Sequence, residues 1–526
     1  MRHIATVATA CVAVTVLAGC GGSGGGGGDD AQVASGGTFT MATNADPGNL
    51  DPQASAATNL YQLSHFAYDS LVNLDAKGTI VSGLATDWKA EGQQLRLTLK
   101  QGITCSDGSP FTAADAAANI GYVADPAHQS PFLGVFVPAG ATATADGDTL
   151  TVQLAGPAPF ALNGLAGVPM VCGKAVTDRS VLAGSTLGTG PYQLKEVVPG
   201  DHLTYTKRKG YSWGPDGAGT DTKGVPDTIT VKVVPNETTA ANLLLSGGLN
   251  AAQIVGQDAQ RLQKQKLFSA SLTTLLGEMW FNQAPGRPAA DPAVRKALTQ
   301  ALDLGQVAKV LSSGQGGPAT QLAANAPAAC PGSSVTGAVP GKDVAAAKKA
   351  LDDAGWKAGS GGVRSKDGTP LKVTFLYNTA LGSGASAAAE LATAAWKDLG
   401  VDVTTTPQDN TAAVNTLFST GDWDVAWAGV NVSSPDQLVP FLSGPAVPEG
   451  NNFAHIDNAG YTSAVAKAMA TDGAQGCDQW FAAEKELFKA ADVVPFANQE
   501  VAYYGKGAEF SLVDVLQPTS IRMLAG

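Results

Sequence analysis

The stretch from Leu371 to Ala428 alternates strand and helix patterns, and this regularity constrains the fold more than any other feature of the chain. Residues 371–377, 401–406 and 423–428 read as buried strands, and residues 385–399 and 412–418 between them read as helices. A β-α-β-α-β order requires a mostly parallel sheet with right-handed crossovers. Ligands of such sheets bind beyond the carboxyl ends of the strands. The pattern therefore predicts an α/β fold with candidate ligand contacts at Asn378, Gly429 and Asn431.

The first 270 residues have a different character. Period-two alternation predicts half-buried strands over 38–43, 95–99, 150–154, 203–206 and 228–233. Thr112 is placed to cap a helix over 112–122, and Asp291 and Asp343 are placed to cap helices in the second half. We therefore predict a strand-rich lobe I over residues 37–275 and an α/β lobe II over 276–492. Residues 493–526 are predicted to return to lobe I, so that two crossings form a hinge.

The N-terminus has the pattern of a secretory signal. A positive charge at Arg2 precedes 15 uncharged residues, which is shorter than the roughly 20 needed to span a bilayer. Leu17-Ala18-Gly19-Cys20 matches the bacterial lipobox, and a glycine-rich tether follows over residues 20–36. We expect residues 1–19 to be removed and Cys20 to carry a lipid. The predicted location is the outer face of the cytoplasmic membrane, or periplasmic space; the alternative is a plain secreted protein.

Four further cysteines follow Cys20. An even number of cysteines in an oxidising compartment predicts two disulfides, and four cysteines allow three pairings. The pairing Cys105–Cys172 with Cys330–Cys477 is favoured because each bridge would close within one predicted lobe. The alternative is four free buried thiols.

Charge and motifs narrow the class of function. The net charge of −12 without a basic run argues against nucleic acid as a partner. The sequence has no HExxH motif and no Walker phosphate loop, and its five histidines show no metal-ligand spacing. We therefore predict no enzyme activity, no metal and no cofactor. The abundant carboxylates leave a glycosidase pair open at this stage.

Several segments, in order along nearly the whole mature chain, carry a family resemblance. They are Asp46–Pro52, Tyr68–Val72, Gly83–Trp88, Leu97–Ile103, Asp107–Asp115, Gly188–Tyr192, Gly210–Trp213, Val294–Asp303 and Ala346–Trp356. With these motifs the chain resembles the large solute-binding proteins of ABC importers, the family 5 group of oligopeptide-, dipeptide- and nickel-binding proteins. The resemblance implies a two-lobed periplasmic-binding-protein fold of the class II type, with an extra subdomain inserted in lobe I at about 60–185. It also implies a monomer that closes on its ligand and delivers it to a membrane permease driven by cytoplasmic ATPases.

The chain differs from peptide-binding members of the family at the positions whose charged side chains bind the ends of a peptide ligand. In peptide-binding relatives an aspartate four residues before a proline binds the ligand amine, and the matching position before Pro435 is Asn431. Dipeptide-binding relatives place an arginine after the first strand of the α/β unit, where this chain has Asn378-Thr379. A neutral amide supplies no opposing charge, so the ligand is expected to be a longer or blocked peptide, or a neutral polar solute such as a saccharide.

Position in the predicted fold gives the remaining pocket candidates. Trp280 and Asn282 are placed where the chain crosses between lobes, Trp427 ends a strand, and Asn44 and Asp46 follow the first strand. Tryptophan rings offer flat faces to side chains or sugars, but burial in the lobe core is an equal alternative for Trp280 and Trp427. For Asn44 and Asp46 the alternative is turn capping. The leading hypothesis is an importer receptor for peptides or peptide-like solutes. The rivals are a receptor for saccharides or other neutral solutes, a transporter-independent sensing or chaperone-like lipoprotein and, more remotely, a secreted hydrolase.

Overall fold

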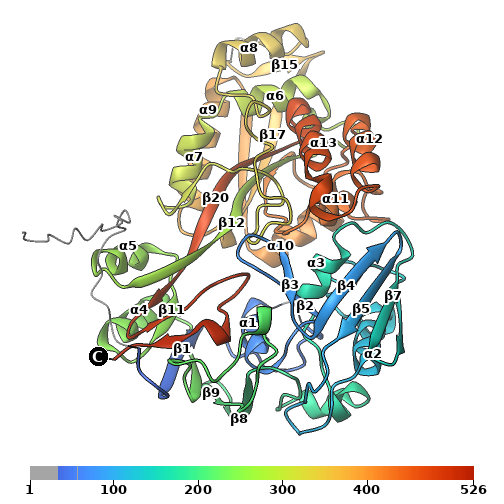
Figure 1. Ribbon diagram of the computed structural model, residues 1–526. Helices are drawn as coiled ribbons and strands as arrows, with labels where there is room; N and C mark the ends of the chain where they lie inside the picture. Colours follow the sequence, from blue (N-terminus) through green and yellow to red (C-terminus); the bar gives the residue numbers. More distant parts are fainter. Residues whose placement is uncertain (1–32, 56, 360, 526) are drawn as a thin grey trace, which may run out of the picture.

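The computed structural model describes residues 33–55, 57–359 and 361–525. The predicted signal segment, Cys20 and most of the tether lie outside these residues. Two lobes are joined by a pair of long strands, β12 (Phe268–Phe281) and β20 (Val493–Gly505), which run side by side from one lobe to the other (Figure 1). Within the described ranges, no helix combines the length and apolarity that a membrane crossing requires.

One mixed sheet runs through both lobes in the order β18-β17-β19-β12-β20-β11-β1-β10-β9-β8, with the short β13 paired to β20. In lobe II, β17 pairs in parallel with β18 and β19, as the β-α-β-α-β pattern predicts. The lobe II strands are β13 (Gly316–Gly317), β14 (Lys357–Ala358), β15 (Arg364–Lys366), β16 (Thr369–Pro370), β17 (Lys372–Asn378), β18 (Asp402–Gln408) and β19 (Val425–Trp427). The lobe II helices are α6 (Pro292–Gln300), α7 (Leu304–Leu311), α8 (Val344–Asp353), α9 (Ala385–Asp398), α10 (Asn410–Asn415), α11 (Val439–Leu442), α12 (Ala459–Ala468) and α13 (Cys477–Ala490).

Lobe I continues the same sheet with the parallel strands β10, β1 and β11 and the antiparallel β9 and β8. Its strands are β1 (Thr38–Thr43), β8 (Tyr192–Val198), β9 (His202–Lys207), β10 (Thr228–Val233) and β11 (Ala251–Gln253). Its helices are α1 (Thr58–Ala67), α4 (Glu237–Ser246) and α5 (Gln257–Lys264). The chain returns to this lobe through β20, and β21 (Ala508–Glu509) and β22 (Arg522–Met523) form a small ribbon at its end.

The two crossing strands change register at the hinge. A β-bulge lies between Leu275 and Glu278 on β12. Gly277 sits inside it, and a Cβ at this position would approach the Phe496 ring to 2.6 Å, so only glycine lets the strands pass this closely. The predicted domain boundary at 275/276 falls at this bulge; the boundaries themselves stay predictions.

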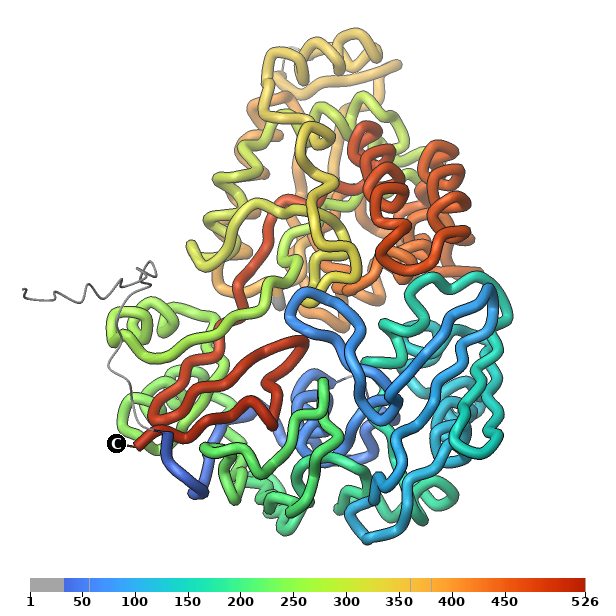
Figure 2. Tube along the Cα trace, viewed as in Figure 1, coloured from blue at the N-terminus to red at the C-terminus, as the bar shows by residue number. Residues whose placement is uncertain are grey.

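A separate four-stranded sheet, in the order β4-β5-β7-β6, lies beside lobe I with its own hydrophobic core (Figure 2). The elements of this part are β2 (Val72–Leu74), β3 (Ile80–Ser82), β4 (Ala85–Glu91), β5 (Gln94–Leu99), β6 (Thr142–Asp146), β7 (Thr149–Gln153), α2 (Ala113–Ala124) and α3 (Ala161–Ala166). Thr112 and Asp115 form a reciprocal capping box at the start of α2, which confirms the predicted cap. We call this part the insert.

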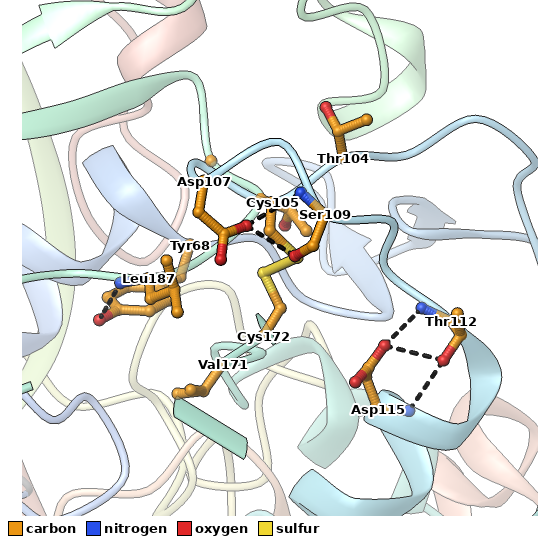
Figure 3. Close-up of a disulfide and its surroundings, with 12 residues drawn as sticks. Tyr68, Thr104, Cys105, Asp107, Ser109, Thr112, Asp115, Val171, Cys172 and Leu187 are labelled. Carbon is orange, nitrogen blue, oxygen red and sulfur yellow. Dashed lines mark hydrogen bonds between the residues drawn. A yellow bond between two sulfur atoms is a disulfide. The ribbon is translucent and has the colours of Figure 1, made fainter. Parts of the chain in front are cut away.

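Both predicted disulfides are present. Cys105–Cys172 joins two segments of the insert core beside the turn in which Asp107 accepts hydrogen bonds from Ser109 (Figure 3). Cys330–Cys477 links the first residue of α13 to a long loop of lobe II. The pairing within each part of the chain is therefore confirmed.

Candidate functional site

Residues of helix α1 line two cavities, one in lobe I and one between the lobes. The larger cavity has a volume of about 350 Å³ and lies at the carboxyl ends of β1 and β10. The lining residues are Met41, Ala42, Thr43, Asn44, Thr58, Asn59, Gln62, Leu63, Val234, Pro235, Glu237, Ala240, Gln253, Val255 and Tyr503. We call it the lobe I cavity. Its position beyond parallel strand ends is the place where α/β sheets bind ligands.

The smaller cavity joins the two lobes. It has a volume of about 60 Å³ and draws residues from α1, the insert, lobe II and the C-terminal return. The lining residues are Tyr61, His65, Asn73, Leu74, Phe136, Asn163, Ala166, Gly167, Ser433, Val513, Asp514 and Gln517. We call it the interlobe cavity. Because Ser433 comes from lobe II and most other residues come from lobe I and the insert, a molecule bound here would contact both lobes.

Asp514 is the centre of the polar network in the interlobe cavity. Its Oδ2 accepts a hydrogen bond from the Tyr61 hydroxyl at 2.7 Å, and His65 Nε2 lies 3.8 Å from the same oxygen. Its Oδ1 accepts from Val515 N at 2.9 Å and from Gln517 Nε2 at 3.3 Å. Burial and the Asp514 carboxylate raise the pKa of Tyr61 well above its usual value, so the hydroxyl remains a donor.

The C-terminal return is fixed to α1 by one buried side chain. Gln62 Oε1 accepts from Leu516 N at 2.9 Å, and Gln62 Nε2 donates to Leu516 O at 3.2 Å. A buried amide that satisfies both the N–H and the C=O of one residue acts like a paired residue of a neighbouring strand. This bridge sets the position of Asp514, two residues earlier in the return.

The lobe II strand ends carry the predicted polar residues. Asn378 is the last residue of β17, and its Nδ2 donates to Asn410 Oδ1 of α10 at 3.0 Å. Figure 1 places α10 at the end of lobe II nearest to lobe I. Gly429 and Asn431 follow β19 and are exposed, and Asn431 stands two residues before Ser433 of the interlobe cavity. Ser433 lines the interlobe cavity, whereas Asn378 is buried and Gly429 and Asn431 are exposed outside its lining.

The loop after β19 is held from beneath by a buried acid. Glu278, on β12, has no exposed surface, and its Oε2 accepts from Val430 N at 2.6 Å. Burial raises the pKa of Glu278 to about 8, the charge of Glu484 contributes in the same direction, and the hydrogen bond from Val430 opposes it. The carboxyl is thus largely protonated at neutral pH and supports the loop without a full buried charge.

A second support comes from the loop around Cys330. Asn325 N donates to Val432 O at 3.3 Å, and Ala329 N donates to Ser433 O at 2.8 Å. The Cys330–Cys477 bridge anchors this support to α13. The disulfide is therefore connected through two backbone hydrogen bonds to a segment that lines the interlobe cavity.

The two tryptophans predicted near the gap lie in the core. Trp280 and Trp427 have no exposed surface, and Trp280 Nε1 donates to Ala428 O at 2.9 Å. They belong to the hydrophobic clusters on the two opposite faces of the lobe II sheet. Strands β12 and β19 are central in a sheet covered on both faces, so side chains in both directions are buried. The alternative interpretation, lobe core, describes both residues.

Asn282 and Asp46 form hydrogen bonds with backbone groups and do not line either cavity. Asn282 Nδ2 donates to Trp423 O at 2.9 Å, which fixes the end of β12 inside lobe II. Asp46 accepts from Gly48 N at 2.8 Å and from Gly200 N at 2.5 Å, as turn capping requires. Of the first-strand candidates, only Asn44 lines a cavity.

The residues that sequence reasoning missed come from two places. Tyr61, His65 and Gln62 lie on a helix whose pattern signals packing only, and Asp514 lies in a C-terminal loop without periodicity. Tyr61 and Asp514 are 453 residues apart in the chain, so no local motif could have joined them.

The insert also contacts lobe II directly. Phe160 is 3% exposed and packs in a lobe II cluster, with its ring centroid 6.3 Å from that of Trp480 on α13. Gly473 N donates to Pro159 O at 3.0 Å, and Gln437 Nε2 donates to Val135 O at 2.9 Å. The lobes are therefore in contact on the side opposite to the hinge strands (Figure 1).

Comparison with known proteins agrees with this architecture. The family model of bacterial extracellular solute-binding proteins, family 5 (Middle), matches residues 79–445, more than half of the chain. The periplasmic murein peptide-binding protein MppA of Escherichia coli is 28% identical over 483 residues, covering 86% of this chain and 85% of MppA. The glutathione-binding protein GsiB of Escherichia coli is 27% identical over 300 residues, 55% of each protein.

Solved structures show the same fold. The unliganded open form of MppA superposes with a TM-score of 0.71 at 23% identity, covering 95% of this chain and 99% of that one. The substrate-binding protein CtaP of Listeria monocytogenes gives a TM-score of 0.75 at 19% identity, covering 93% and 99%. The family match establishes the class of protein, and these structures show its fold. The chain therefore belongs to the bacterial extracellular solute-binding proteins of family 5, the non-enzymatic substrate-binding components of ABC transporters.

Proposed function

We propose that this protein captures peptides or peptide-like solutes between its two lobes and delivers them to the permease of an ABC importer. The observation that carries the proposal is the interlobe cavity, because one bound group there would contact Tyr61 and Asp514 on one side and Ser433 on the other. A ligand that contacts both lobes stabilises the closed arrangement by its differential affinity. The lobe I cavity at the ends of β1 and β10 supplies the larger share of the room.

The peptide class is supported by relatives and by size. MppA is named for murein peptides and GsiB for glutathione, and both names describe short peptides. A volume of about 350 Å³ equals roughly a dozen water molecules at about 30 Å³ each. That room favours a short ligand. Asn44, Asn378, Gly429 and Asn431 are the contacts we propose from the two sets of strand ends.

A neutral polar solute is the second candidate. The neutral amides of Asn378, Asn410 and Asn431 on the lobe II side favour it, because amides pair with hydroxyls as well as with peptide groups. A saccharide would meet these side chains without requiring a charged partner.

We also propose lipid attachment through Cys20, from the lipobox and the glycine tether. Cys20→Ser should move the protein from the membrane fraction to the soluble fraction while ligand binding by the soluble protein is unchanged. Continued membrane association of that variant would argue against the anchor.

The test of ligand class is native mass spectrometry with thermal unfolding against matched panels of di- to tetrapeptides and of mono- to trisaccharides. A ligand at 100 times its Kd should add about 2.7 kcal/mol to the free energy of unfolding. Bound peptides with a matching shift support the first candidate. A response to sugars alone supports the second, and silence on both panels contradicts both.

A further inference from the structure

The interlobe cavity contains an acidic side chain but no lysine or arginine among its described lining residues. Asp514 is the only carboxylate among those residues. The described lining of the lobe I cavity likewise contains an acidic residue, Glu237, and no basic side chain. His65 is a basic side chain in the lining of the interlobe cavity, with its Nε2 3.8 Å from Asp514 Oδ2. A cation entering either cavity meets a carboxylate.

The Asp514 carboxylate is preorganised and still accessible. Three hydrogen bonds, from Tyr61, Val515 and Gln517, fix its plane. A carboxylate offers about four acceptor positions, so one remains. The side chain is 31% exposed, which leaves that position open to a ligand while the rest of the group is held.

Aromatic rings line the same cavity as this carboxylate. The Tyr61 and Phe136 rings stack at a centroid distance of 6.3 Å with 16° between their planes, and His65 contacts Tyr61 edge-on at 4.8 Å. Aromatic faces attract cations, and the attraction grows when solvent is excluded. A cavity that combines a carboxylate with aromatic rings is suited to a cationic nitrogen with N–H donors.

The opposite wall is neutral and the space is small. Ser433 contributes a hydroxyl from lobe II. About 60 Å³ accommodates the volume of roughly two water molecules, which suits one end of a ligand rather than a whole one.

We propose that Asp514 binds the cationic nitrogen of the ligand, a primary ammonium or similar N–H donor, beside the rings of Tyr61 and Phe136. This inference rests on the proposed function, because the cavity lies between the lobes that would close on the ligand. If Asp514 only tied the C-terminal return to α1, its charge would not affect cation binding.

The test uses two probes of equal size, n-butylammonium and 1-butanol, with saturation-transfer NMR on the full-length protein. We expect contact with butylammonium, none with butanol, and loss of the butylammonium signal in Asp514→Asn. Asparagine keeps an acceptor for Tyr61, and thermal unfolding checks that the variant is folded. Glu509→Gln removes the same charge from an exposed position in the same C-terminal segment and should bind butylammonium like the parent.

A second arm joins the subsite to the peptide proposal. We expect Ala-Ala-Ala to bind about tenfold or more tightly than its N-acetylated form, and Asp514→Asn to bring the two within about twofold. Asp514→Ser also removes the charge and should likewise lose the preference, which provides a second variant if Asp514→Asn is poorly folded.

The outcomes separate the two proposals. Equal butylammonium signals in the parent and in Asp514→Asn, or none in either, overturn the cation subsite. Peptide binding without preference for the free amine overturns the subsite and leaves the peptide proposal standing. A charge-dependent butylammonium signal with no peptide binding supports the subsite and contradicts the peptide proposal.

Discussion

Glu278 Oε2 accepts a hydrogen bond from Val430 N at 2.6 Å, and this contact joins the hinge strand β12 to the loop that carries Asn431. The other carboxylate oxygen, Oε1, is buried without a hydrogen-bond partner. An ionised carboxylate would therefore be only partly compensated at this position. The protonation of Glu278 consequently links the stability of the fold to pH.

We predict that Glu278→Gln removes a loss of stability at alkaline pH. The folded-state pKa of about 8 lies above the usual value of 4.5, so the native state binds more protons than the unfolded state between these values. The free energy of unfolding therefore falls as pH rises from about 4.5 to 8, by up to about 3 to 5 kcal/mol. Urea unfolding from pH 5 to 9 should show the variant near the parent at pH 5 and more stable at pH 9.

Glu484→Gln is the matched comparison for this prediction. Burial raises the pKa of Glu484 to about 7, and Ser334 and Leu322 donate hydrogen bonds to it. Its difference from the parent should begin in the same pH range, level off near pH 7 instead of pH 8, and be smaller than that of Glu278→Gln. A difference curve for Glu278→Gln that stays flat across the pH range would contradict the assignment.

Local signals in the sequence predicted the parts of the fold that depend on neighbouring residues. Asp343 caps α8 by accepting from Ala346 N at 2.9 Å, and the parallel β17–β18 pairing follows from the alternation of strand and helix. Both cysteine pairs also follow, because each closes within one part of the chain. No helix is predicted over residues 459–490, where α12 and α13 lie.

The site was less predictable because it depends on contacts far apart in the chain. Strand order predicts which residues follow the strand ends, and this located Asn44 at a cavity. It does not predict which sheet faces are covered, and Trp280 and Trp427 are buried for that reason. Asp514 reaches the cavity only because Gln62 holds Leu516, a contact across 454 residues.

We predict that removing the Cys330–Cys477 bridge, by replacing both cysteines with serine, weakens both stability and ligand binding. The chain-entropy model gives about 5 kcal/mol for a separation of 147 residues. Binding should fall because the loop around Cys330 supports Val432 and Ser433. Replacing Cys105 and Cys172, separated by 67 residues, should cost about 4 kcal/mol with little effect on affinity. Equal effects on affinity from the two removals would contradict the supporting role.

We predict that Phe160→Ala opens the lobes. The ring lies in the lobe II core although the residue belongs to the insert, so truncation removes apolar contact between the two bodies. Small-angle scattering of the ligand-free protein should show a larger radius of gyration, and ligand affinity should fall. Phe111→Ala removes a buried ring within the insert and should reduce stability without changing compactness. An unchanged radius for Phe160→Ala would show that Phe160 does not hold the lobes together.

We predict that Asn431→Asp increases affinity for ligands with a free amine. Asn431 is exposed after β19, so the change adds a carboxylate to the lobe II wall without burying a charge. A charge-assisted hydrogen bond is roughly twice as strong as a neutral one, which corresponds to a gain of about three- to tenfold for Ala-Ala-Ala. Calorimetry with the free and the N-acetylated peptide separates the charge effect from a change in shape.

The same substitution can also be tested in a protein that already carries Asp514→Asn. If both carboxylates serve the same nitrogen, Asn431→Asp should restore part of the preference for the free amine in Asp514→Asn. High salt should reduce the gain, because the new carboxylate is exposed and its interaction is screened. A gain that is equal for the free and the acetylated peptide would mean that the loop after β19 contacts the ligand elsewhere than at its amine.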